Sequence, residues 1–207
     1  DDSLRAARQA ASGKVRIIAQ KNQGTAVARN TGIEHAAGEY IAFLDADDEW
    51  KRNYLETIDT LTERYPQSDI FVTAYRVVMG NDKYNYSSRL TPDEGCLESY
   101  WMTFQYPYDF VWTSATVIRK SAILRAGGFK PGERIGQDLD LWARVARINP
   151  RVAYSSAVCV DYHRNAGQNA RSREKIACAE AFLRDLEEEL ENPEHSREEL
   201  DMIQYKY

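Results

Sequence analysis

The sequence has 207 residues, which suits one domain with a sizeable core. Apolar residues make up 43% of it and charged residues 29%, which is the composition of an ordinary globular protein. The formal net charge of −5 argues against a protein that binds nucleic acid or an anionic membrane through a basic patch.

The first part of the chain alternates predicted helices and strands. Gly38 and Pro66 are typical of residues that end a helix. The predicted helices cover residues 3–11, 25–37 and 50–65. Short apolar runs, several of them β-branched, predict strands, which cover residues 15–19, 40–44 and 70–78. Strands that alternate with helices in this way predict βαβ units and an α/β fold with a mainly parallel sheet.

The pattern changes after residue 79. Residues 80–95 are polar and rich in turn formers, which predicts a loop or a hairpin. The elements predicted beyond them are a short aromatic helix at residues 97–105, a strand at 111–118, a helix at 121–126 capped by Ser121, a Gly-Gly-Phe turn at 127–129, a helix at 139–147 and a strand at 152–160. From residue 171 the sequence is acidic and helical, with a break at Asn192-Pro193. We therefore divide the chain into a domain at residues 1–170 and a helical appendage at residues 171–207.

Three acids follow directly on the predicted strand at residues 40–44. Asp45 and Asp47 are two residues apart, so their side chains point to the same side of an extended chain. Ligands of open α/β sheets bind beyond the carboxyl ends of the strands, where these acids lie. Together with Asp48 they form a cluster whose negative charge a hard divalent cation would balance, with a diphosphate as a bridging ligand of that cation. A solvated turn that begins the next helix explains the same acids equally well.

Small residues precede that strand, on and before the predicted helix at residues 25–37. Gly24 and Gly32 allow a backbone or a ligand to approach closely, and the N-terminus of the helix favours an anion. Arg29 on the same helix can reach a nucleotide with its planar guanidinium group. The alternative for Arg29 is an ordinary salt bridge at the surface.

The string NQGTAVARNTGIEHAAGEYIAFLDADD at residues 22–48 resembles the corresponding region of family 2 glycosyltransferases, whose fold is called GT-A. The resemblance continues through residues 50–65, 114–129 (SATVIRKSAILRAGGF) and 136–145 (GQDLDLWARV). It implies an α/β GT-A fold with helices that flank a mainly parallel sheet. The family domain opens with a strand, a helix and a second strand, so we expect that the chain lacks this first unit and that the natural protein is longer.

The resemblance assigns roles to individual residues of this chain. Asp47 corresponds to the acid that ligates a divalent metal ion, expected to be Mn²⁺ or Mg²⁺, and Asp45 to the acid near the ribose. Asp138 corresponds to the general base. The residues expected at the nucleotide-sugar donor are Gly24, Arg29, Asp45, Asp47, Gly128, His163 and Arg164.

Two of these assignments have competitors. Many relatives carry Glu before the base, whereas this chain carries Gln137, and Asp140 lies two residues after Asp138. Asp138 is also suited to cap the helix predicted at residues 139–147. For His163, the alternative to a diphosphate contact is a hydrogen-bonded histidine at the end of a strand.

Aromatic residues gather before and within the predicted strand at residues 111–118. Sugar rings stack on aromatic faces, so this cluster is a candidate for acceptor contact. A hydrophobic core beneath a long connection is the alternative. The cluster consists of Trp101, Phe104, Tyr106, Tyr108 and Trp112.

These features together predict an inverting glycosyltransferase. It would move a sugar from a nucleoside-diphosphate donor, expected to be a UDP-sugar, to a saccharide or lipid-linked acceptor in polysaccharide assembly. The expected setting is the cytoplasm or the cytoplasmic face of a membrane, with peripheral association. One alternative is a catalytically weak domain that binds nucleotide sugars. A nucleotidyltransferase of similar architecture is disfavoured, because the N-terminal part of this sequence has no Gly-rich phosphate loop.

Overall fold

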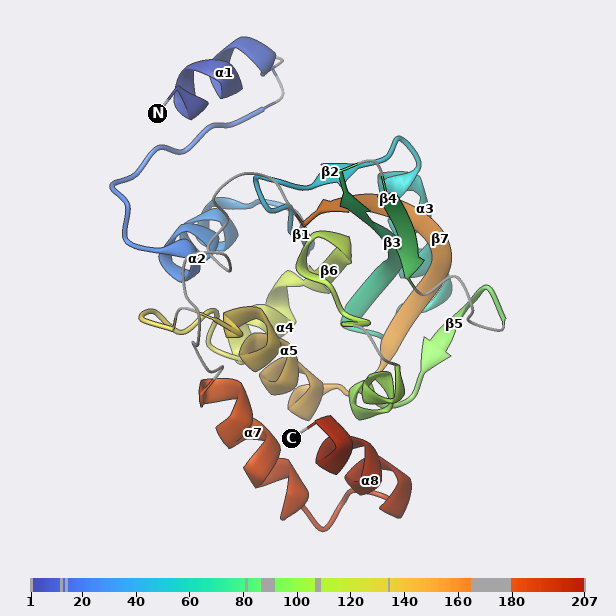
Figure 1. Ribbon diagram of the computed structural model, residues 1–207. Coiled ribbons are helices and arrows are strands. Elements are labelled where there is room, and N and C mark those ends of the chain that lie inside the picture. Colours follow the sequence, from blue (N-terminus) through green and yellow to red (C-terminus); the bar gives the residue numbers. More distant parts are fainter. Residues whose placement is uncertain are drawn as a thin grey trace.

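The computed structural model describes residues 2–11, 13, 15–80, 82–86, 92–106, 109–133, 135–164 and 180–206. Its strands form one sheet in the order β1-β6-β3-β7-β2, with β4 paired to β3 and β5 paired to β7. The strands are β1 (Tyr40–Ala42), β2 (Glu49–Trp50), β3 (Ile70–Met79), β4 (Asp82–Tyr86), β5 (Glu94–Leu97), β6 (Thr116–Arg119) and β7 (Val152–His163). Strands β3 and β7 curve side by side through the centre of the sheet (Figure 1).

The sheet is mixed, which corrects the expectation that it is mainly parallel. Strands β3 and β7 pair in parallel, from Ile70↔Val152 onward. The other pairings of the described strands are antiparallel: β6 lies between β1 and β3 and runs opposite to both, β4 pairs with β3, and β2 and β5 pair with β7. The α/β class with flanking helices is confirmed. Periodicity identified these strands but does not encode the direction in which distant strands pair.

Helices cover both faces of the sheet. The α-helices are α1 (Ser3–Ala10), α2 (Thr25–His35), α3 (Tyr54–Arg64), α4 (Lys120–Arg125), α5 (Gln137–Ile148), α7 (Glu180–Leu190) and α8 (Arg197–Lys206), and the 3₁₀ helices are η1 (Tyr100–Gln105) and η2 (Thr113–Ala115). On one face α3 packs Tyr54 and Leu61 in a cluster with Phe71 of β3. On the other face Trp142 of α5 lies in a cluster with Ile70 of β3. Because Val72 enters the second cluster with Ile70, and Tyr75 and Val77 enter the first with Phe71, strand β3 is buried on both faces.

Several predicted boundaries shift for identifiable reasons. The helix expected at residues 50–65 begins at Tyr54, because Trp50 joins β2 and pairs with β7. The strand expected at residues 111–118 is confined to β6, since residues 113–115 turn as η2. Arg119, and not Ser121, occupies the N-cap position of α4. The hairpin expected after residue 79 is confirmed by the pairing of β4 with β3.

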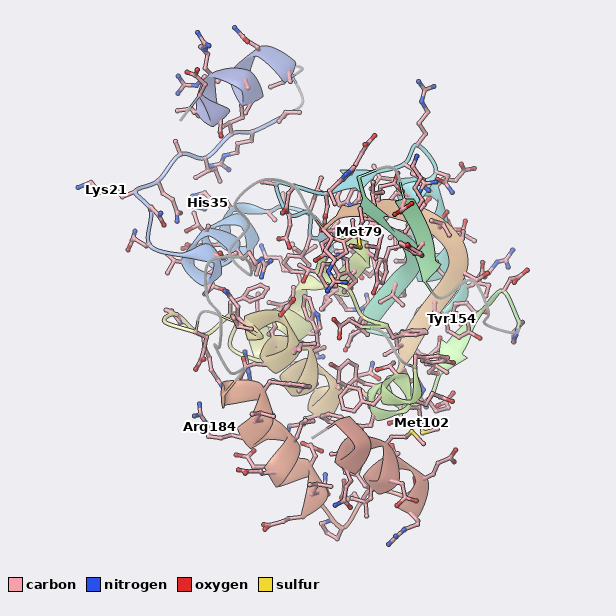
Figure 2. The ribbon with its side chains drawn as sticks, viewed as in Figure 1. Lys21, His35, Met79, Met102, Tyr154 and Arg184 are labelled. Atoms are coloured by element: carbon pink, nitrogen blue, oxygen red, sulfur yellow. The ribbon has the colours of Figure 1, made fainter. Side chains whose placement is uncertain are left out.

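The strand predicted at residues 15–19 is wrong. Residues 15–24 have no regular secondary structure, and the side chains of Val15 and Ile18 are 57% and 40% exposed. Figure 2 shows Lys21 pointing outward from this segment, which links α2 to an α1 helix without buried residues. β-branched residues favour a strand only where a neighbouring strand and a covering layer hold them, and the described residues offer this segment neither.

Helices α7 and α8 lie side by side below α5 (Figure 1). Phe182 and Leu186 of α7 and Ile203 of α8 belong to the same hydrophobic cluster as Trp142. The predicted break at Asn192-Pro193 separates the two helices. The predicted start of the helical segment, residue 171, lies outside the described residues. The division of the chain at residue 170 therefore stays a prediction. No helix among the described residues is long and apolar enough to cross a membrane.

Candidate active site

The three acids that follow β1 have different surroundings. Asp45 accepts a hydrogen bond from Arg29 on α2, with 2.6 Å between Nη2 and Oδ1. The Arg29 side chain is 14% exposed and also lies over the Phe129 ring, 5.2 Å from its centre. The Asp45 backbone N–H donates to Ser114 Oγ at 3.1 Å. Arg29 therefore forms a salt bridge, which was the alternative to nucleotide binding. The salt bridge joins two residues that were both predicted to bind the nucleotide-sugar donor.

Asp48 is tied into the protein from three sides. Its Oδ2 accepts from Ser114 Oγ at 2.5 Å and from Trp112 Nε1 at 3.3 Å, and its Oδ1 accepts from the backbone N–H of His163 at 3.3 Å. Burial raises the pKa of the Asp48 carboxyl above its usual value, and the charge of Asp47 acts in the same direction. The hydrogen bonds that the carboxyl accepts act in the opposite direction. Asp48 thus joins the acidic loop to η2 and to the end of β7.

Asp47 is the acid that best fits a metal ion. It is half-buried, and in the described part of the chain no cation lies within ion-pair distance of it. The described residues contain no preformed group of three or more His, Cys, Asp or Glu that could hold a metal. A magnesium-type ion commonly takes only one or two carboxylates from the protein and the rest of its oxygens from phosphates and water. A single carboxylate at this position is compatible with such a site.

Asp138 and Asp140 differ clearly in their surroundings. Asp138 lies in the first turn of α5 and is half-buried. Its Oδ2 accepts a hydrogen bond from Thr113 Oγ1 at 2.5 Å, and its Oδ1 accepts one from the Leu139 N–H at 3.0 Å. Asp140 is fully buried and ion-paired to Lys130 and Arg144. Asp140 is therefore a structural residue, which leaves Asp138 as the candidate base. Gly136, and not Asp138, is the N-cap of α5.

The Gly-Gly-Phe turn is held from two helices. Asn30 of α2 donates from Nδ2 to the carbonyl of Phe129 at 2.8 Å and accepts the Phe129 N–H at 2.9 Å. Arg144 of α5 donates to the carbonyls of Ala126 and Gly128. Gly127 and Gly128 have φ values of 84° and 69°, which residues with a Cβ rarely adopt. The turn predicted from sequence is confirmed, and its shape fixes the position of Phe129 beneath Arg29.

Gly128→Ala is expected to destabilise the protein more than Gly127→Ala. Both changes force a Cβ into the left-handed region at about 1–2 kcal/mol. At Gly128 the added Cβ would also lie 2.9 Å from Asn30 Oδ1, whereas at Gly127 it meets nothing within 4 Å. The loss of the Asn30 contacts adds about 1–3 kcal/mol. Thermal unfolding measures the stability of both variants. Equal losses of stability would show that the two hydrogen bonds between Asn30 and Phe129 contribute nothing.

The remaining residues predicted to bind the nucleotide-sugar donor lie at or next to the ends of helices and strands. Gly24 is the N-cap of α2 with φ of 90°, and its N–H donates to Asn22 Oδ1 at 3.0 Å. His163 ends β7 and reaches Asp48 through its backbone N–H. Arg164 donates its backbone N–H to the Val78 carbonyl and has an exposed side chain. The structure therefore links His163 to the acidic loop through its backbone.

The aromatic cluster divides between core and site. Trp101 and Phe104 are 2% and 5% exposed and contact each other in the core, which matches the core alternative for these two residues. Trp112 stacks on Tyr75 and packs against Tyr162 beside Asp48. Tyr106 is half-buried and stacks on Phe110, and Tyr108 lies outside the described residues.

A groove of about 330 Å³ lies between α2 and β1. It is lined by Arg29, Gly32, Ile33, Ala36, Tyr40, Ile41, Ala42, Phe43 and Leu44. The acids of the loop and Asp138 do not line it. We place the candidate site at the acids, because carboxylates can bind a metal ion or accept a proton. Of the residues that line the groove, only Arg29 contacts this site.

Sequence reasoning missed three residues that connect the site. Thr113 and Ser114 hold Asp138 and Asp48, and Asn30 holds the Gly-Gly-Phe turn. Their partners are 25, 66 and 99 positions away in the sequence. Asn30 and Ser114 lie inside the strings that resembled a family, but no local pattern indicated what they bind.

Comparisons with known proteins agree on one family and one fold. The model of the family described as "Glycosyl transferase family 2" matches residues 1–127. The pre-mycofactocin glycosyltransferase of Mycobacterium tuberculosis (strain H37Rv) is 30% identical over 144 residues, which are 67% of this chain and 30% of that protein. The uncharacterized glycosyltransferase YibD of Escherichia coli (strain K12) is 53% identical over 47 residues, which are 23% of this chain and 14% of that protein.

A solved structure extends the comparison to nearly the whole chain. The crystal structure of S. aureus TarS 1–349 in complex with UDP-GlcNAc superposes with a TM-score of 0.72 and 15% identity, covering 98% of this chain and 58% of that chain. This likeness confirms the predicted GT-A fold. The chain spans little more than half of the TarS chain, and the matched segments span less than a third of the two relatives named above.

Proposed function

Since the chain belongs to glycosyl transferase family 2, we propose that it transfers a sugar from a nucleoside-diphosphate donor to an acceptor hydroxyl, with inversion at the anomeric carbon. The acceptor that the family resemblance favours is a saccharide or a lipid-linked saccharide. The same resemblance favours a role in polysaccharide assembly, in the cytoplasm or on the cytoplasmic face of a membrane.

One observation carries this proposal. The acidic loop after β1 and Asp138 at the start of α5 meet at η2, where Ser114 bonds to Asp48 and the adjacent Thr113 bonds to Asp138. Adjacent α-carbons are about 3.8 Å apart, so the candidate base lies close to the loop that carries the acids proposed for the donor. Glycosyl transfer requires this neighbourhood, because the acceptor oxygen must reach the anomeric carbon next to the diphosphate.

The proposed chemistry uses side chains of different kinds. Asp138 takes the proton of the acceptor hydroxyl as that oxygen attacks the anomeric carbon, and the nucleoside diphosphate leaves from the opposite side. Asp47 would hold a divalent cation, Mn²⁺ or Mg²⁺, which when bound neutralises charge that develops on the leaving diphosphate. The guanidinium of Arg29, which is held by Asp45, would contact the nucleotide.

A UDP-sugar is the donor we propose. TarS, whose fold this chain shares, is described in complexes with UDP-GlcNAc and with UDP. The likeness supports uridine as the first nucleoside to test.

The test is the thermal stability of the full-length protein with UDP, GDP, CDP, ADP or dTDP, each with and without Mn²⁺. A ligand at 100 times its Kd stabilises a protein by about 2.7 kcal/mol. For a domain of this size we expect UDP with Mn²⁺ to raise Tm by about 5–10 °C. Asp47→Asn is expected to abolish the metal-dependent part of this rise.

Asp59→Asn is the matched control, because Asp59 is an exposed acid on α3 away from the acidic loop. It should retain the full rise in Tm. If no nucleotide raises the Tm of the wild-type protein at saturating Mn²⁺, the proposal of an active transferase is wrong. A rise in Tm without any sugar transfer would instead support the catalytically weak, nucleotide-sugar-binding alternative.

A further inference from the structure

Two adjacent buried hydroxyl groups lie between the two halves of the proposed site. Thr113 and Ser114 are 2% and 0% exposed and belong to the single turn η2. Burying a hydroxyl group destabilises the folded protein unless the group has a hydrogen-bond partner. Both hydroxyls have partners, and both partners are carboxylates of the proposed site.

The Thr113 hydroxyl fixes the candidate base. It donates to Asp138 Oδ2 at 2.5 Å, while the other carboxylate oxygen accepts the Leu139 N–H at 3.0 Å. The second bond is local to α5, so it follows any movement of that helix. The bond from Thr113 is the one that sets the carboxylate relative to the sheet, because η2 leads directly into β6.

The Ser114 hydroxyl fixes the acidic loop. It donates to Asp48 Oδ2 at 2.5 Å and accepts the Asp45 N–H at 3.1 Å, so one oxygen holds both ends of the loop at residues 45–48. The Ser114 carbonyl accepts from Trp50 Nε1 at 2.7 Å, which anchors the residue beyond the loop as well. Asp47 lies inside the segment that these contacts shape.

We propose that Thr113 and Ser114 are separate positioning residues for the two halves of the reaction, Thr113 for the orientation of Asp138 and Ser114 for the loop that binds the donor diphosphate. The inference rests on the proposed function and deepens it. It follows that loss of one hydroxyl impairs the chemical step and loss of the other impairs donor binding, although the two residues are neighbours in one turn.

Thr113→Val and Ser114→Ala test this division. Thr113→Val keeps the shape of the side chain and is expected to lower kcat about 10- to 100-fold, with the Kd for UDP and Mn²⁺ within about 3-fold of wild type. Thr113→Ser should restore kcat to within about 3-fold. Ser114→Ala is expected to raise the Kd for UDP and Mn²⁺ about 10-fold, with kcat at saturating donor within about 3-fold of wild type. Release of UDP from UDP-GlcNAc, or from the sugar nucleotide that supports turnover, measures kcat, and calorimetric titration measures Kd.

Thr116→Val controls for the loss of a buried hydroxyl. Thr116 is 0% exposed and follows the same turn, but its hydroxyl donates to the Trp112 carbonyl and not to a site carboxylate. It should lower Tm about as much as Thr113→Val does and change neither kcat nor Kd beyond about 2-fold. Ser114→Cys, which preserves the size of the side chain, replaces Ser114→Ala if the latter does not fold.

A double mutant separates positioning from general destabilisation. In protein that already carries Asp138→Asn, Thr113→Val should cause no further loss of kcat, because the base that it orients is gone. Multiplicative losses would overturn the inference, as would Thr113→Val and Ser114→Ala lowering kcat and UDP affinity in equal proportion. Those results leave the proposed function intact if the wild type binds UDP and turns over. A wild type that does neither overturns the function and the inference together.

Discussion

Asp138→Asn is expected to lower kcat for sugar transfer by about 10²- to 10⁴-fold, the range that a positioned general base contributes. The amide oxygen of Asn can still accept the Thr113 hydroxyl, so the loop and the helix α5 should keep their positions. The variant loses the ability to take a proton and the hydrogen bond that Oδ1 accepts from the Leu139 N–H, which is local to α5. The affinity for UDP and Mn²⁺ should therefore stay within about 3-fold of wild type, which calorimetric titration checks alongside the turnover assay.

Two controls make this result specific to the base. Asp59→Asn removes an exposed carboxylate of α3 and should leave kcat unchanged. Asp138→Glu retains a carboxylate but moves it by one methylene, so partial activity is expected, between that of the wild type and that of Asp138→Asn. If Asp138→Asn retained more than about a tenth of wild-type kcat, proton transfer to Asp138 would not be part of the rate-limiting chemistry.

The helices were well predicted because the signals that define them are local. The amphipathic pattern of α3, with Tyr54, Ile58 and Leu61 on one side, and the break at Asn192-Pro193 depend on residues within a few turns of each other. The apolar run of β3 identified a strand buried on both faces for the same reason. Local signals of this kind also located the Gly-Gly-Phe turn.

The errors concern contacts between distant segments. The run at residues 15–19 has strand composition, but β propensity depends on a partner strand that its own sequence cannot specify. The antiparallel insertion of β6 between β1 and β3 brings Thr116 beside Val72 and Val117 beside Ala42. No periodicity within residues 111–118 indicates either neighbour.

The candidate site divides in the same way. The sequence proposed the acids and Asp138 as site residues, because their spacing and their resemblance to a family are local properties. It left Asp140 as a competitor of Asp138, and the structure separates them by their partners: a hydroxyl and an N–H for Asp138, two cations for Asp140. The connecting residues Thr113 and Ser114 could not be found, since a threonine or serine has no distinct pattern until its partner is known.

Asp140→Asn is expected to lower the free energy of unfolding by about 3–5 kcal/mol, the usual cost of breaking a buried ion pair from one side. Asp140 is 0% exposed and accepts from Lys130 Nζ at 2.6 Å and from Arg144 Nη2 at 2.5 Å and Nε at 3.1 Å. The neutral variant leaves the Arg144 guanidinium, whose side chain is 14% exposed, without its countercharge. Because Arg144 also holds the Gly128 carbonyl, the Gly-Gly-Phe turn should loosen. For this chain length a loss of that size lowers Tm by about 6–20 °C in thermal unfolding.

The pH dependence of this loss provides the sharper test. Burial alone would raise the pKa of Asp140, but Arg144 and Lys130 hold it below its ordinary value of 3.8. A lowered pKa means that the stabilisation is complete above about pH 4 and is lost as pH falls through the folded-state pKa. Asp185 on α7 shifts in the opposite sense, since burial and the charge of Asp140 raise its pKa to about 6 and its ionisation destabilises the fold as pH rises through that range. The Asp140→Asn variant lacks the charge that raises the Asp185 pKa, so above about pH 6 it is spared part of the cost of ionising Asp185. We therefore expect the difference in unfolding free energy between wild type and Asp140→Asn to be largest between about pH 4 and pH 6, somewhat smaller at pH 7, and to shrink below pH 4. An equal difference at pH 3 and pH 5 would mean that the Asp140 charge does not stabilise the fold.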